Sequence, residues 1–187
     1  MPAHITTVAV DDYDMREPPA WFDRTFAVPY PSDLLPLLLV RLRGAPPRLE
    51  DATRRCSPEG LMSKPDGKWS AQENAGHMLA VEPIWLARVD DYVLGHGSLT
   101  VADLTNRNTC DANFNAAPFD QMLADFRAAR EKLLRRVEVL DASSFAAAIP
   151  HPRMGTLMTL ADHLSFVAEH DDHHLAHIWS LCRKHTS

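Results

Sequence analysis

The strongest constraint on the fold is a long segment near the end of the chain, residues 159–184, in which apolar residues recur at helical spacing. On a wheel that turns about 100° per residue, one side of this segment is apolar. That side holds Leu160, Leu164, Val167, Ile178 and Leu181. The pattern predicts a helix with one face in a hydrophobic core.

Three further segments also predict helices. The first starts near Ser32, which is placed to act as its N-cap, and residues 44–47 leave open whether this helix is interrupted. The second, residues 70–95, is the best marked, because it opens on the capping box "SAQE" and ends at a glycine. The third covers residues 119–140. Since no stretch shows the alternation of a strand, the chain predicts an all-α four-helix bundle.

The chain divides into an arm and a body. Its 187 residues suit one domain with a sizeable core. Residues 1–31 are proline-rich and aperiodic, so we expect an irregular N-terminal arm whose Trp21, Phe22 and Phe26 pack back on the body. Residues 32–187 would then form the single bundle domain.

Composition excludes several functions. The net charge is -6, with 19 basic against 25 acidic residues, which argues against a nucleic-acid partner. The longest apolar run, "LLPLLLV", is far too short to span a bilayer, and the start shows no signal-peptide pattern. Three widely spaced cysteines suggest neither a disulfide framework nor a thiolate zinc site. We therefore expect a cytoplasmic protein without a membrane partner.

Four histidines lie within eight residues of the last predicted helix, in "EHDDHHLAHIW". On the wheel His174 lies among the core residues and His170 lies at the edge of the apolar stripe, whereas His173 lies furthest round and His177 is intermediate. Each of the pairs 170/174 and 173/177 has the i, i+4 spacing that lets two imidazoles reach one ion. The wheel favours His170 with His174, and the other pair stays open.

A third ligand comes from the second predicted helix, where His77 shares a stripe with Val81 and Ile84. A lone histidine on an apolar face is more often a core residue, but an inward pair on another helix favours ligation, because bundles build metal sites from facing helices. We therefore predict a divalent cation on His77, His170 and His174. Three imidazoles leave positions open for water or substrate, so no further catalytic residue is assigned.

Metal-bound histidines usually donate their second ring N–H to a neighbouring acceptor. Glu73, Asp171 and His177 are the candidates on adjacent helical positions. Each also has a plain reading, as a helix cap, a solvated acid and a polar edge residue respectively.

The long polar connection over residues 97–117 is a candidate for the rim of a substrate pocket. Its polar residues Asp103, Arg107, Asn108 and Asn113 could hold a polar substrate. An ordinary surface loop with turn residues explains the same composition equally well.

Two stretches, "DGKWSAQENAGHMLAVEPIW" and "LADHLSFVAEHDDHHLAHI", resemble the DinB/YfiT-like family of metal-dependent enzymes. They contain a Trp-Ser helix start, a histidine seven residues after that serine, and a late HxxxH followed by His and Ile. The likeness covers roughly residues 32–180. It implies an up-down-down-up four-helix bundle, often a homodimer, with nickel or zinc on the three histidines. Some relatives are S-transferases or isomerases that use bacillithiol or mycothiol.

Three functions are compatible with these residues. The first is a thiol S-transferase, in which the metal lowers the pKa of a small thiol that then reacts with an electrophile. The second is a metal-dependent hydrolase, which would need Glu73 or Asp171 as a base, although the sequence has no HExxH motif. The third is a non-catalytic metal-binding protein of the stress response. We expect an enzyme, with small molecules as its partners.

Overall fold

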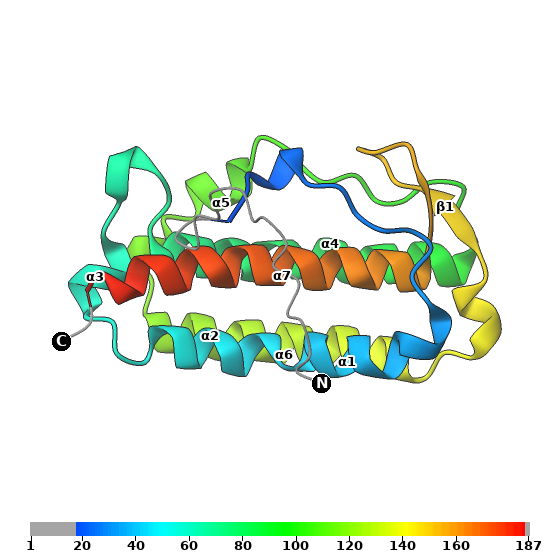
Figure 1. Ribbon diagram of the computed structural model, residues 1–187, viewed down its shortest axis with the longest axis horizontal. Helices are drawn as coiled ribbons and strands as arrows, with labels where there is room; N and C mark the ends of the chain where they lie inside the picture. The colour runs from blue at the N-terminus through cyan, green and yellow to red at the C-terminus, as the bar shows by residue number, and fades with distance from the viewer. Residues whose placement is uncertain (1–17, 186–187) are drawn as a thin grey trace, which may run out of the picture.

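The computed structural model describes residues 18–185 as a four-helix bundle, which confirms the predicted all-α fold (Figure 1). The four helices of the bundle are α1 (Leu35–Arg43) continued by α2 (Ala45–Thr53), α4 (Ala71–Leu94), α6 (Phe119–Glu138) and α7 (Leu160–Arg183). Figure 1 shows that the first and last of them run in one direction and the two middle ones run in the other, which is the up-down-down-up order.

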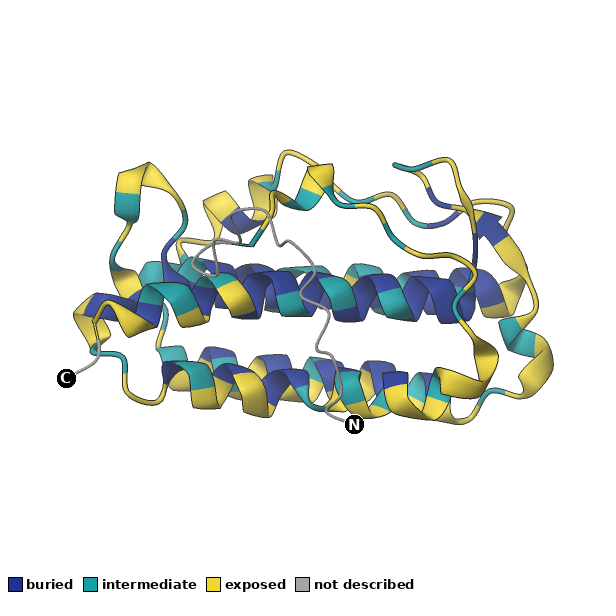
Figure 2. Cartoon of the chain, in the orientation of Figure 1, coloured by how far each residue is buried: buried dark blue, intermediate teal, exposed yellow. Residues whose placement is uncertain are grey.

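Helix α7 lies at the centre of the arrangement. It packs against α4 on one side and against α1 and α2 on the other, while α6 contacts the same three helices from across the bundle. Figure 2 shows α7 buried along most of its length, whereas α1 and α2 alternate buried and exposed turns. No helix within residues 18–185 is both long enough and apolar enough to cross a bilayer.

The first helix of the bundle differs from the sequence expectation at its start. Ser32 opens a single 3-10 turn, Ser32–Leu34, instead of capping a helix. The possible interruption at residues 44–47 is present, because Pro46 and Pro47 lack the N–H groups that would continue the helical hydrogen bonds. It is slight. The chain stays helical at Gly44, whose carbonyl accepts from the Arg48 N–H at 3.1 Å.

Capping boxes start both helices that carry the histidines, which sets their registers. At α4 the Ser70 Oγ accepts from the Glu73 N–H at 3.0 Å, and the Glu73 carboxylate accepts from the Ser70 N–H at 2.9 Å. At α7 Thr159 and Asp162 exchange the same pair of bonds. The first of these boxes was predicted from the sequence.

The connection between α4 and α6 is fastened over the turn of α4 that carries His77. A Cβ at Gly76 would lie 2.2 Å from the Phe114 ring, so only glycine lets that ring pack against the helix. The Gln72 amide donates to the carbonyls of Phe114 and Ala117 at 2.7 and 2.8 Å. The short helices of the connections are α3 (Pro58–Met62), η3 (Pro65–Gly67), α5 (Arg107–Asp111), η4 (Phe114–Ala116) and η5 (Ala142–Phe145).

A small hairpin precedes α7, although no stretch of the sequence shows the alternation of a strand. Strands β1 (Ala148–Pro150) and β2 (Leu157–Thr159) pair antiparallel, with Ile149 opposite Met158. Three residues per strand are too few to show an alternating pattern, which is why the sequence did not reveal them. The turn between the strands brings His151 and Arg153 to the body of the bundle.

The described part of the N-terminal arm, residues 18–31, runs over α7; residues 1–17 of the predicted arm lie outside the described residues. Trp21 and Phe26 pack on Phe166 with ring centroids 5.1 and 5.0 Å apart, as the sequence predicted. Phe22 is largely exposed, but its ring contacts the body through Arg153, whose guanidinium carbon lies 5.0 Å from the ring centroid. An ion pair between Arg24 and Glu169 also holds the arm to α7.

Candidate metal centre

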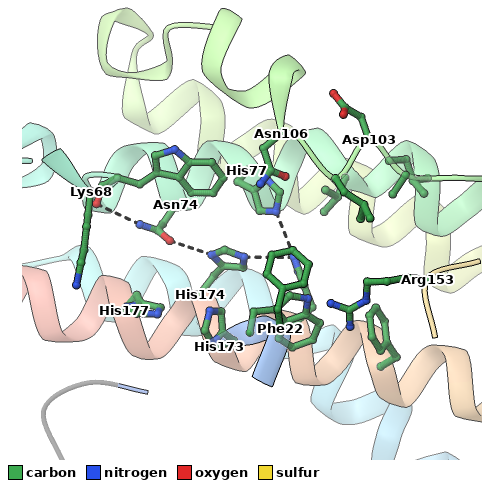
Figure 3. A pocket seen from close by; sticks show the side chains of 18 of the residues that line it. Phe22, Lys68, Asn74, His77, Asp103, Asn106, Arg153, His173, His174 and His177 are labelled. Atoms are coloured by element: carbon green, nitrogen blue, oxygen red, sulfur yellow. Dashed lines mark hydrogen bonds between the residues drawn. The ribbon is translucent and has the colours of Figure 1, made fainter. Parts of the chain in front are cut away.

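Three imidazole rings from two helices converge in the interior. His77 comes from α4, and His170 and His174 come from α7; all three side chains are buried. The Nε2 atom of His170 lies 3.2 Å from the Nε2 atoms of both other rings. Figure 3 shows His77 and His174 with these nitrogens turned toward the common point. The structure thus brings together the three residues predicted as ligands.

The opposite nitrogens of two of these rings are held by neighbours. The Nδ1 of His174 lies 2.9 Å from Oδ1 of Asn74, and the Nδ1 of His77 lies 2.9 Å from the Thr109 hydroxyl. The Asn74 amide nitrogen donates to the Ser70 carbonyl, so its oxygen faces His174 and can only accept. His174 therefore carries its proton on Nδ1, and its Nε2 lone pair points to the convergence. If His77 also carries its proton on Nδ1, that N–H donates to the Thr109 hydroxyl and the Nε2 lone pair is free.

The residues fit a divalent cation. Burial lowers the pKa of His77 to about 4 and the pKa values of His170 and His174 well below the ordinary value, so the rings are neutral at neutral pH. The Nε2 of His170 lies 3.2 Å from both other Nε2 atoms, an arrangement in which one cation can accept a lone pair from each of the three rings. Two imidazoles bound at about 2.1 Å to one tetrahedral ion stand roughly 3.4 Å apart, close to the observed separation.

The alternative pair lies beside this point. The rings of His173 and His177 contact each other with centroids 4.6 Å apart, and both line the adjoining cavity. His173 is buried, so the wheel reading that placed it furthest outward is wrong. The reason is tertiary: Trp21 of the arm covers it at a ring distance of 5.5 Å.

The supporting residues proposed from the sequence have other partners. Glu73 caps its helix and pairs with Lys64 at 2.8 Å, and buried Asp171 pairs with Arg130 of α6 at 2.5 Å. His177 lies against His173. The contacts to the triad come instead from Asn74 and Thr109. The sequence contained a signal for Asn74, which lies three residues before His77 on the same helical face.

A cavity of about 630 Å³ opens beside the triad, within the usual size range for small-molecule sites. The connection contributes Asp103 and Asn106 to its wall. The predicted pocket residues Arg107, Asn108 and Asn113 do not line it, and all three are exposed. In α5 the residue turned toward α4 is Thr109, so Arg107 and Asn108 face outward. The aromatic part of the lining consists of Trp21, Phe22, Trp69, Trp85 and Phe166.

Among the cavity residues that sequence reasoning missed are Arg88, His151 and Arg153. Arg88 follows His77 by eleven residues, or three helical turns, so the stripe of His77, Val81 and Ile84 could have pointed to it. The hairpin that carries the other two left no sequence signal.

Comparisons with known proteins agree with this architecture. The sequence model of the DinB superfamily matches residues 41–178. Among solved structures, YfiT from Bacillus subtilis, described as a probable metal-dependent hydrolase with an unusual four-helix bundle topology, superposes with a TM-score of 0.75. It is 17% identical over 91% of this chain and 97% of its own, a likeness that shows a shared fold. No curated protein matches the sequence significantly.

Proposed function

The chain belongs to the DinB superfamily, and on that premise we propose that it is an enzyme whose reaction depends on one divalent cation held by His77, His170 and His174. The observation that carries the proposal is the convergence of three buried, neutral Nε2 atoms beside a cavity of small-molecule size. Nickel and zinc, both of which accept imidazole ligands, are the proposed ions.

The chemistry follows from the donor set. A divalent cation bound there supplies Lewis acidity, which lowers the pKa of a thiol or water molecule in contact with it. Asn74 and Thr109 hold the rings of His174 and His77 in the tautomers that leave Nε2 free, so the site does not have to reorganise.

Among possible reactions, we propose the transfer of a low-molecular-weight thiol to a carbon electrophile. Glu73 and Asp171, which a water-activating mechanism would need as bases, are engaged in other contacts. Thiolate formation needs no strong base once the pKa of the thiol has fallen. The C–S bond then forms, the bond from carbon to its leaving group breaks, and the thiol proton passes to solvent. The aromatic lining suits an apolar electrophile.

Hydrolysis is the second candidate, favoured by the likeness to YfiT and its description as a probable metal-dependent hydrolase. His173 would be the base for a water molecule, since it lines the cavity. Burial lowers the pKa of His173 to about 4, so its ring is neutral at neutral pH but is a weaker base than an ordinary histidine. The homodimer and the single domain over residues 32–187 remain predictions.

Metal content tests the site. Untagged protein purified without chelator is measured by plasma mass spectrometry as wild type and as His77→Ala, His170→Ala and His174→Ala, with His173→Ala as the matched control on the same helix. We expect close to one ion per chain in the wild type and the control, and little in the other three. Retention in all variants, or loss only in the control, contradicts the assignment.

The reaction is tested separately. Metal-loaded protein is mixed with bacillithiol, mycothiol or glutathione and a panel of alkylating electrophiles, and adducts are measured by mass spectrometry beside His170→Ala. Metal-dependent adducts support the transferase, whereas turnover of esters or amides without adducts supports the hydrolase. A loaded protein that does neither favours the non-catalytic metal-binding role.

A further inference from the structure

The cavity has a second polar region, formed by Arg88, His151 and Arg153, some distance along the bundle from the three histidines. Figure 3 shows Arg153 on the opposite side of Phe22 from His174 and His177. On α4 the rise from His77 to Arg88 is about 16 Å along the helix axis. The lining on α7 runs from Phe166 to Leu181, so the cavity is elongated, and the two guanidinium groups lie to one side of the three histidines along it.

Arg88 is a buried cation without a carboxylate in contact. Its Nε donates to the Thr100 carbonyl at 2.9 Å, and its Nη1 lies 3.2 Å from Nε2 of His151. Within residues 18–185 no acidic side chain lies within ion-pair distance of it. The acid that acts on it from further away, Asp91, is bonded to His96 and to the Thr100 N–H. A buried charge of this kind is expensive unless an anion meets it.

His151 faces donors on both sides. Its Nδ1 accepts from the backbone N–H groups of Arg153 and Met154 at 3.3 and 3.4 Å, which places the ring proton on Nε2. Burial and the two arginines lower its pKa to about 4, so the ring is neutral. The Nε2–H and the Arg88 Nη1 are then two donors 3.2 Å apart that share no acceptor among the described residues. An oxygen atom placed beside them, within hydrogen-bond reach of both nitrogens, would accept from both.

Arg153 adds a second charge, which is only partly buried. Its guanidinium lies over the rings of Trp21, Phe22 and Phe166, with its carbon 5.8, 5.0 and 5.7 Å from the ring centroids. Cation–π contacts hold the faces of the group and leave its N–H edges available. No carboxylate pairs with it in the part of the chain that the structure describes. A further donor in the wall, Trp85 Nε1, is buried without an acceptor among those residues.

The lining of the cavity carries a net positive charge, whereas the chain as a whole carries a net negative charge. The net charge of the protein is -6, yet four cations line the cavity, against two carboxylates. The cations are Lys68, Arg88, Arg153 and Lys184, and the carboxylates are Asp66 and Asp103. Asp103 is already occupied, because its oxygens accept from Thr105 and Arg107 in its own loop.

We propose that Arg88, Arg153 and His151 form a subsite for an oxyanion, a carboxylate or a phosphate, on the small-molecule substrate. The substrate is then an elongated anion, whose oxyanion lies between the two arginines and whose reacting group lies at the three histidines. This reading rests on the proposed function for the role of the three histidines, whereas the subsite itself follows from the unpaired donors.

The test uses three aromatic probes of similar size: benzoate, phenyl phosphate and neutral benzyl alcohol. Their binding to the full chain is measured by calorimetry, both in metal-loaded protein and after chelation. Arg153→Gln is the main variant, and exposed Arg135→Gln on α6 is the control. Arg88→Gln is added where thermal melting shows that it folds. We expect an anion to bind both forms and to bind Arg153→Gln about ten-fold or more weakly, with benzyl alcohol unchanged.

The outcomes separate this inference from the proposed function. Benzoate binding above that of phenyl phosphate identifies a carboxylate subsite, and the reverse order identifies a phosphate subsite. Anion binding that depends on Arg153 but not on the metal supports the subsite even if the enzyme proposal fails. The inference is overturned if anion binding is unchanged in Arg153→Gln, or if it disappears only on chelation. It is also overturned if neither anion binds.

Discussion

Arg130 of α6 ties together the helices that carry the histidines, and its removal tests how the site is held. Its guanidinium donates to Glu82 of α4 at 2.5 and 3.1 Å and to Asp171 of α7 at 2.5 and 3.0 Å. It also donates to the Leu42 carbonyl at 3.1 Å, which is free because Pro46, four residues later, has no N–H. The side chain is 1% exposed. Asp171 is the direct neighbour of His170 in the sequence.

Arg130→Met would leave two buried carboxylates without their cation. Breaking a buried ion pair from one side destabilises a protein by about 3–5 kcal/mol, which is a third or more of a typical domain's stability of roughly 5–15 kcal/mol. Replacing the whole group is different, because well-packed apolar residues avoid the desolvation of the ions. We therefore expect the triple variant with Glu82→Met and Asp171→Leu to regain most of the loss.

The loss in Arg130→Met should depend on pH. Burial raises the pKa of Glu82 to about 7 and raises that of Asp171, and the charge of Arg130 opposes both rises. Without that charge the pKa values rise further, so the folded variant takes up protons that the unfolded chain does not. The stability difference from wild type is then largest above the folded pKa values of the variant. It shrinks as the pH falls through them to the folded pKa of the wild type, about 7 for Glu82.

Urea unfolding followed by circular dichroism measures these free energies, at about pH 9 and about pH 6, on either side of the folded pKa of Glu82. An m value that is the same in the wild type and the variants indicates that unfolding stays two-state, so their free energies of unfolding can be compared. The reasoning fails if Arg130→Met loses less than about 1 kcal/mol at the higher pH, the scale of an ordinary substitution. It also fails if the loss is as large at the lower pH, or if the triple variant is no more stable than the single one.

Gly76→Ala should lower the free energy of unfolding by about 1–3 kcal/mol in urea melts, because its Cβ meets the Phe114 ring, and unchanged stability would show that the ring is not packed there. Asn74→Leu should weaken metal binding about 10-fold or more in competition with a chelator, since His174 loses its acceptor; affinity equal to wild type would contradict that role. His163→Phe should gain stability relative to wild type as the pH falls below about 6.5. Burial holds the pKa of His163 in the folded protein well below that value, and neither ring nitrogen has a partner within residues 18–185. Below about pH 6.5 the unfolded wild type therefore takes up a proton at His163 that the folded wild type does not, whereas the variant has no such group. A difference that stays constant between neutral and acidic pH would show that His163 is accessible to protons.

Local patterns in the sequence were enough to predict the bundle and the three converging histidines. The capping box at Ser70 sets where α4 starts, and the apolar stripe of α7 sets which face turns inward. Because helical periodicity is local, the inward positions of His77, His170 and His174 follow from each helix separately.

Contacts between distant segments needed the tertiary structure. Thr109 reaches His77 only because Gly76 lets the connection pack on α4, and His173 is buried only because the arm crosses α7. The hairpin that brings His151 beside Arg88 has strands too short to leave a pattern. The sequence alone therefore determined the helices and the inward histidines, because caps and periodicity act over a few residues. Only the tertiary structure decided what supports those histidines and what lines the rest of the cavity, because those contacts join segments that no local pattern relates.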